Sequence, residues 1–131
     1  MAEGFMRLWG GESVRVMSAG SHPASQVSPL AIEVMREKGI DISHQFPKSL
    51  ESVADESFDW VITLCDDAKQ VCPIFRGKDG AARQLHWSIP DPCGASYDEE
   101  EILYEYRSAR DLIASRIANW LKEELGIVVE V

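Results

Sequence analysis

The sequence has no long apolar segment, no excess of positive charge and few cysteines. No apolar run approaches the ~20 residues that a membrane-spanning helix requires. The first residues, Met1–Phe5, lack the basic region and apolar core of a signal peptide. Acidic residues outnumber basic ones by 22 to 13, for a formal net charge of −9, which argues against a nucleic-acid or anionic-membrane partner. We therefore expect a cytoplasmic protein that binds neither membranes nor nucleic acids.

The three cysteines, Cys65, Cys72 and Cys93, are too few for a disulfide framework. Cys65 and Cys72 stand seven positions apart after a strand-like run, and Asp91 follows on a later loop. Because parallel sheets place their chemistry at the C-terminal ends of strands, this arrangement indicates a redox or phosphoryl-transfer site. Two alternatives remain open. The cysteines could be buried small hydrophobes, or they could bind metal with His86, although their spacing matches no familiar zinc pattern.

The periodicity of apolar residues predicts a single domain over residues 1–131. Helices are expected at 1–9, from Ser28-Pro29 to Gly39, at 48–53 and at 98–125, with a short helix or turn at 66–71. Strands are expected at 14–19, 60–64 and 83–87, and the apolar run at 60–64 should be buried on both faces. His86 is expected to be packed within its strand. Alternating helices and strands predict an α/β fold with a parallel sheet.

Several short motifs occur in the order and spacing of a known family. The chain resembles the thioredoxin-coupled arsenate reductases, relatives of the low-molecular-weight tyrosine phosphatases, over almost its whole length. The motifs are Met1-Ala2-Glu3-Gly4-Phe5, Ser18-Ala19-Gly20, Cys65 with Cys72-Pro73, His86-Trp87 and Asp91-Pro92. The resemblance implies the doubly wound parallel sheet of the low-molecular-weight phosphatase fold.

One part of the family pattern is missing from the 131 residues. In that family, a first, central strand and a Cys-x5-Arg-Ser loop come before the Met-Ala-Glu-Gly-Phe stretch, and this sequence contains neither. Such a loop binds an oxyanion through backbone N–H groups and the arginine, and it activates the cysteine thiol. We therefore interpret the chain as truncated at its N-terminus and expect no turnover from it as given.

The absent strand would lie between residues 14–19 and 60–64. The segment 127–131 is rich in β-branched residues and could fill that place, in the same chain or in a partner. Alternatively, this segment is a loose tail, and the chain forms a homodimer, aggregates or leaves the gap open.

The resemblance implies roles for individual residues. Cys65 and Cys72 match the second and third cysteines of a disulfide relay that delivers electrons from thioredoxin, and Asp91 matches the general acid. Without the resemblance, Asp91 reads equally well as a turn aspartate. Glu3 and Ser18 match positions that help to hold a monovalent cation in some members, but the aspartate that accompanies them there is not found near Ser49.

The function implied is reduction of arsenate to arsenite, with no cofactor and no bound metal. The substrate would be arsenate or a phosphate-type anion. The cysteine pair and the His-Trp before the acid favour the reductase over the phosphatases. Three alternatives stay open: a fragment of a low-molecular-weight tyrosine phosphatase, a non-enzymatic interaction module that lost its active-site loop, and a thiol-redox protein that uses Cys65 and Cys72 alone.

Overall fold

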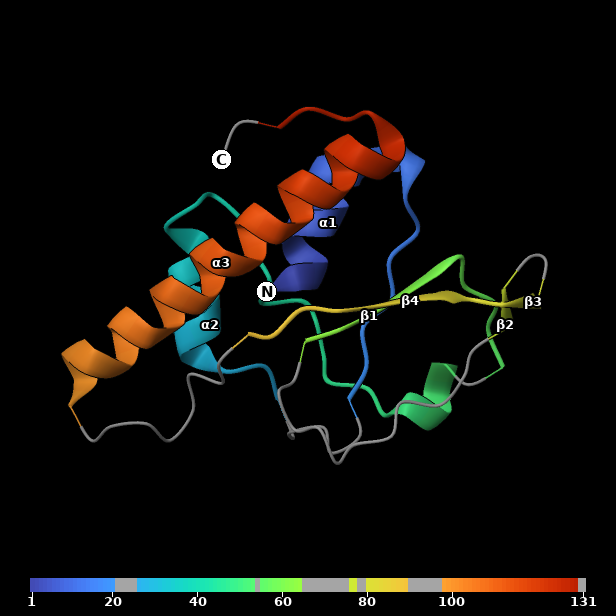
Figure 1. The fold of residues 1–131 in the computed structure, drawn as a ribbon. Coiled ribbons are helices and arrows are strands. Elements are labelled where there is room, and N and C mark those ends of the chain that lie inside the picture. Colours follow the sequence, from blue (N-terminus) through green and yellow to red (C-terminus); the bar gives the residue numbers. More distant parts are fainter. Residues whose placement is uncertain (21–25, 54, 65–75, 78–79, 90–97, 130–131) are drawn as a thin grey trace.

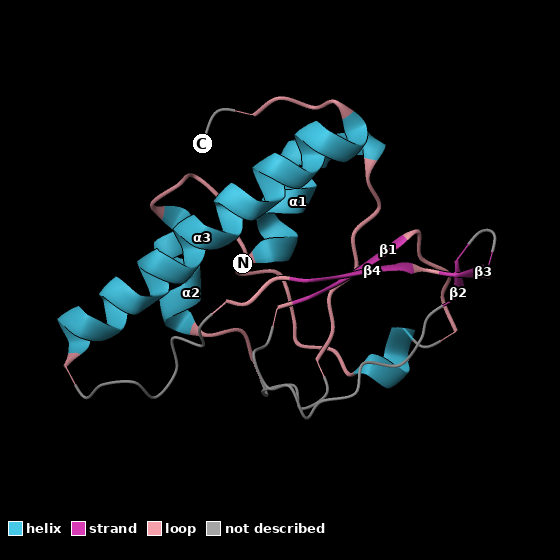
Figure 2. Ribbon diagram, viewed as in Figure 1, coloured by secondary structure: helices cyan, strands magenta, loops and turns pink. Residues whose placement is uncertain are grey.

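A computed structural model describes residues 1–20, 26–53, 55–64, 76–77, 80–89 and 98–129. Three α-helices lie together on one side of a parallel pair of strands, and a short 3₁₀-helix lies on the other side (Figure 1). Figure 2 shows the same arrangement coloured by secondary structure. The predicted α/β class with parallel strands is confirmed.

Helix α1 (Ala2–Gly10) ends where the sequence predicts that it should. Gly11 follows it with a φ of 53° and Gly39, after the second helix, has a φ of 76°, conformations that cost glycine little. A 3₁₀ turn, η1 (Gly11–Ser13), then leads into residues 14–19. Helix α1 buries Phe5 and Met6 against the other helices, and it also buries the acidic Glu3.

Helices α2 (Pro29–Arg36) and α3 (Glu99–Leu125) pack against one another and complete the helix layer. Asp98 caps α3 by accepting a hydrogen bond from the Glu100 amide, and Gly126 ends α3 in the left-handed region. The expected apolar stripe of α3 is buried from Tyr106 to Leu121. Ser28 precedes α2 as predicted, but its hydroxyl bonds to the Tyr106 hydroxyl at 3.0 Å instead of capping the helix.

Strands β1 (Trp60–Thr63) and β4 (Arg83–His86) pair in parallel, with Thr63 opposite His86. A smaller antiparallel pair joins β2 (Arg76–Gly77) to β3 (Gly80–Ala81). All four residues of β1 are half-buried, so β1 is covered on both faces but less completely than predicted. Within the described ranges β4 is the strand neighbour of β1, which leaves the opposite edge of β1 without a paired strand.

The two faces of β1 meet different parts of the core. Trp60 and Ile62 pack against the helix layer, whereas Val61 packs against a second, smaller cluster. That cluster is built around Val53 of the 3₁₀-helix η2 (Leu50–Val53) and includes Met17. The helical turn expected at 48–53 is therefore present.

Residues 14–19 are extended, but the predicted strand is wrong. Only the following residue, Gly20, forms a bridge, with Ser49; its amide donates to the Lys48 carbonyl at 2.9 Å, and its carbonyl accepts from the Leu50 amide at 3.1 Å. A segment with strand-like residues becomes a strand only when a neighbour pairs with it. Among the described residues, no other strand pairs with 14–19.

The C-terminal segment does not replace a strand in the residues that can be followed. Residues 127–129 form no strand, and Ile127 and Val129 pack against the helix layer instead. Residues 130–131 lie outside the described part. Within that part, no helix combines the length and apolar character needed to cross a membrane.

Candidate functional site

The C-terminal ends of β1 and β4 meet at one edge of the sheet. The Trp87 amide donates to the Thr63 carbonyl at 2.8 Å, and the Ile89 amide donates to the Leu64 carbonyl at 3.2 Å. Leu64 directly precedes Cys65, and Ile89 stands two positions before Asp91. The chain thus enters the cysteine segment and the aspartate segment from adjacent points, at the edge where parallel sheets place their chemistry.

The predicted site residues themselves fall outside the described part of the structure. This holds for Cys65, Cys72 and Asp91, and also for Cys93. Their roles in a relay, in acid catalysis or in metal binding therefore stay predictions.

A hydrogen bond between side chains joins the two strands at this edge. Thr63 Oγ1 lies 2.7 Å from His86 Nδ1 and also donates, over a longer 3.4 Å, to the Leu85 carbonyl. Either atom can be the donor in the shorter contact, depending on the tautomer of His86. Sequence reasoning missed Thr63, because its place opposite His86 depends on the register of the two strands.

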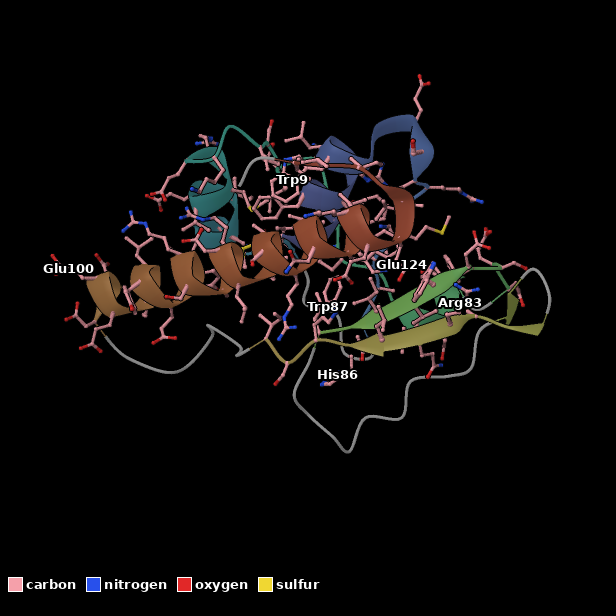
Figure 3. The ribbon with its side chains drawn as sticks, turned by 45° about the horizontal axis from the view of Figure 1, so that its top comes forward. Trp9, Arg83, His86, Trp87, Glu100 and Glu124 are labelled. Atoms are coloured by element: carbon pink, nitrogen blue, oxygen red, sulfur yellow. The ribbon has the colours of Figure 1, made fainter. Side chains whose placement is uncertain are left out.

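His86 points away from the helix layer, while the next residue, Trp87, points toward it (Figure 3). His86 is exposed and Trp87 is half-buried against the core. The expectation that His86 is a packed strand residue is therefore wrong. Successive side chains alternate across a strand, so packing Trp87 places its neighbour on the outer face.

A second polar cluster surrounds the buried carboxylate of Glu3 on α1. The Ser18 hydroxyl donates to Glu3 Oε1 at 2.6 Å, Lys48 Nζ lies 3.6 Å from the same oxygen, and Arg7 Nε lies 3.2 Å from Oε2. Glu3 is only 6% exposed, and burial alone would raise its pKa. The Ser18 hydrogen bond and the charges of Lys48 and Arg7 outweigh burial and lower the pKa of Glu3.

A cleft of about 570 Å³ opens beside this cluster. Its walls combine positive charge with the apolar side chains of the extended segment, and they are formed by Arg7, Gly11, Val14, Arg15, Val16, Met17 and Lys48. Arg15 pairs with Glu56 at 3.5 Å. The Arg7 guanidinium donates to the Val16 carbonyl at 3.1 Å. The cleft therefore offers an apolar wall beside basic groups, in a chain that is acidic as a whole.

The model of the low molecular weight phosphotyrosine protein phosphatase family matches residues 1–127. The chain belongs to this family. The arsenate reductase of Bacillus subtilis (strain 168) is 36% identical over 117 residues, which cover 89% of this chain and 81% of that protein.

Comparison with solved structures agrees with the relatives found by sequence. A structure of an arsenate reductase in the oxidized state superposes with a TM-score of 0.74 at 31% identity, covering 93% of this chain and 86% of that one. The thioredoxin-dependent arsenate reductase of Corynebacterium glutamicum superposes with a TM-score of 0.56 at 35% identity, covering 88% and 52%. The resemblance read from the sequence motifs is confirmed, and the α/β fold with parallel strands matches these structures. The doubly wound sheet and its missing central strand stay predictions.

Proposed function

We propose that the chain is an arsenate reductase-type member of the phosphatase family and carries the relay half of the reaction. The observation that carries the proposal is the paired edge of β1 and β4. At this edge, a backbone hydrogen bond joins Leu64 to Ile89. Leu64 directly precedes Cys65, and Ile89 stands two positions before Asp91. The similarity to arsenate reductases over most of the chain supports it.

In the proposed reaction, a loop cysteine holds arsenate as a thiol adduct, and Asp91 protonates the departing oxygen, which leaves as water. The Cys65 thiolate then attacks the sulfur of the adduct. A disulfide forms, and the arsenic leaves with the electron pair of the S–As bond as arsenite. Next, the Cys72 thiolate attacks Cys65 and releases the loop thiolate. A dithiol such as thioredoxin reduces the Cys65–Cys72 disulfide and completes the cycle.

We further propose that the 131 residues alone do not turn over. None of the cysteines is followed six positions later by arginine, so no Cys-x5-Arg loop is present. A strand carrying such a loop would fit the cleft at Val14, Val16 and Met17, where residues 14–19 pair with no strand among the described residues. In this proposal the protein acts in the cytoplasm as a single domain, and a homodimer is the other way to cover the cleft.

The test compares the chain with a version preceded by a family-type strand and Cys-x5-Arg-Ser loop. With arsenate, thioredoxin and thioredoxin reductase, we expect NADPH oxidation only from the extended version. Cys65→Ser and Cys72→Ser should each lower the rate of NADPH oxidation by orders of magnitude, since either serine breaks the relay. Cys93→Ser is the matched control and should retain activity. Turnover by the 131-residue chain would contradict the proposal.

The two relay cysteines can be tested without the loop. After mild oxidation of the chain, mass spectrometry of proteolytic fragments should find a Cys65–Cys72 disulfide that thioredoxin reduces. The two Cα atoms must come within about 7 Å for this bond. A disulfide through Cys93, or no oxidation, would remove the relay assignment.

The family match itself favours a second candidate, because the family is that of the low molecular weight phosphotyrosine protein phosphatases. The extended version would then hydrolyse an aryl phosphate, independently of Cys65 and Cys72. Hydrolysis that survives both serine substitutions, with no arsenate reduction, would select the phosphatase. Failure of both reactions in a folded extended version would instead favour an interaction module.

A further inference from the structure

The carboxylate of Glu3 is enclosed by groups that donate hydrogen bonds or carry positive charge. Lys48, Arg7 and Ser18 occupy both of its oxygens. The Met1 amino group also interacts electrostatically with Glu3. Glu3 lies in the first turn of α1, where the helix dipole adds further positive potential.

Some members of the phosphatase family hold a monovalent cation at the positions of Glu3 and Ser18, but the residues present here do not fit one. A hard cation requires several oxygen ligands, whereas ammonium and guanidinium groups have donors and no acceptor. Lys48 Nζ lies 3.6 Å from Glu3 Oε1 and Arg7 Nε lies 3.2 Å from Oε2, so both carboxylate oxygens already face a positive charge. The carbonyl of Lys48 already accepts from the Gly20 amide. A metal ion at Glu3 would therefore meet two fixed cations at contact distance.

We infer that Lys48 supplies from within the chain the positive charge beside Glu3 that a monovalent metal ion would otherwise supply, so that the protein neither needs nor binds such an ion there. The inference concerns the described residues around Glu3 and does not rest on the proposed relay.

Both the backbone and the side chain of Lys48 make contacts that hold its ammonium group near Glu3. Its backbone carbonyl holds Gly20, and its ammonium lies 4.9 Å from the centre of the Phe46 ring. Its side chain is 23% exposed, against 55% for Arg7 and 73% for Arg15. Lys48 is thus the most enclosed of the three basic residues at the cleft, and it links the loop before η2 to Glu3 of α1 and to Gly20.

The first test needs no substitution. We expect the melting temperature of the chain to be the same in potassium, sodium and choline chloride at one ionic strength of about 0.1 M, which screens surface charges equally. A rise in potassium or sodium over choline, which saturates with concentration, would show a cation site and overturn the inference.

The second test removes the charge. Lys48→Met keeps the length and apolar contacts of the side chain, and we expect its melting temperature to fall by about 3–5 °C. Arg15→Met is the matched control, because Arg15 lines the same cleft but pairs only with the partly exposed Glu56. It should change the melting temperature by less than about 1 °C. An unchanged Lys48→Met would overturn the inference.

A double variant separates the charge of Lys48 from its packing. In a Glu3→Gln background, Lys48→Met should no longer lower the melting temperature, since the amide has no charge to balance. An equal loss in both backgrounds would assign Lys48 a packing role alone and would overturn the inference. If Glu3→Gln does not fold, the comparison of salts on the unaltered chain still decides the question.

Discussion

The helix layer and the strand side of this protein differ in how completely their apolar side chains are buried and in whether their backbone is paired. In the helix layer, Val34, Ile117 and Leu121 are completely buried. On the strand side, every residue of β1 is half-buried. Residues 14–19 pair with no strand among the described residues. The helix layer is thus complete in itself, whereas the strand side has edges that another strand can pair with.

Polar groups follow the same division. In the helix layer, the buried Arg110 donates to the Val34 carbonyl at 2.9 Å, to Glu37 at 2.8 Å and to Asp111 at 2.8 Å. Where the helix layer meets β1, the indole N–H of Trp120 is buried with no hydrogen-bond partner among the described residues. Trp120 meets Trp60 edge to face at 5.7 Å. The unsatisfied buried side-chain group thus lies on α3, at the place where the helix layer meets β1.

The largest expected difference comes from emptying a core position on each side. Ile117→Ala in α3 should lower the free energy of unfolding by about 3 kcal/mol, because a fully enclosed site cannot collapse around the lost atoms. Val61→Ala in β1 should cost about 1 kcal/mol, since its side chain is half-buried in the smaller cluster. Urea denaturation measures both. Equal losses would mean that the strand side is as tightly packed as the helices.

Removing the buried arginine tests whether the helix layer depends on its polar contacts. Arg110→Met should lower the free energy of unfolding by about 2–3 kcal/mol, because it leaves the buried Val34 carbonyl without its donor. Arg107→Met is the control: Arg107 also binds Glu37, through bonds of 3.0 and 2.7 Å, but it is exposed. Its loss should be clearly smaller. If Arg107→Met lowers the free energy of unfolding more than Arg110→Met does, the exposed ion pair with Glu37 contributes more stability than the buried contacts of Arg110.

Adding one methyl group at a glycine sharpens the comparison further. A Cβ at Gly4 in α1 would lie 2.8 Å from a methyl carbon of Ile42, which is fully buried and has nowhere to move. Gly4→Ala should therefore destabilise the protein by about 1–2 kcal/mol despite the better helix propensity of alanine. Gly20→Ala meets no atom within 4 Å and should stay within about 0.5 kcal/mol. Thermal unfolding followed by circular dichroism compares the two.

The smallest effect concerns acid stability of the helix layer. Hydrogen bonds from Arg107 and then Arg110 lower the pKa of Glu37 to about 2 from an ordinary value of 4.5. A lowered folded-state pKa gives stability that is fully present above pH 4.5 and is lost as the pH falls toward 2. Urea midpoints should therefore fall more steeply over this range in the unaltered chain than in Glu37→Gln. Parallel curves would show that the Glu37 pairs contribute nothing.

Much of the fold follows from local sequence. The stop of α1 at Gly10-Gly11, the Asp98 cap and the Gly126 end of α3 depend on residues within one or two turns of each other. The apolar stripe of α3 and the parallel strands at 60–63 and 83–86 could be predicted for the same reason. The family could also be named from short motifs whose order survives in the linear chain.

Tertiary structure alone decided the side-chain contacts between residues that lie far apart in the sequence. Arg110 donates a hydrogen bond to the Val34 carbonyl, 76 positions away in the sequence. His86 and Thr63 are hydrogen-bonded across 23 positions, and Ser18 donates to Glu3 across 15. Residues 14–19, with a strand-like sequence, have no strand partner in the described part. Local preference fixes a conformation only when neighbours along the chain suffice. A buried charge, a strand register or a paired edge is fixed by whichever distant group packs beside it.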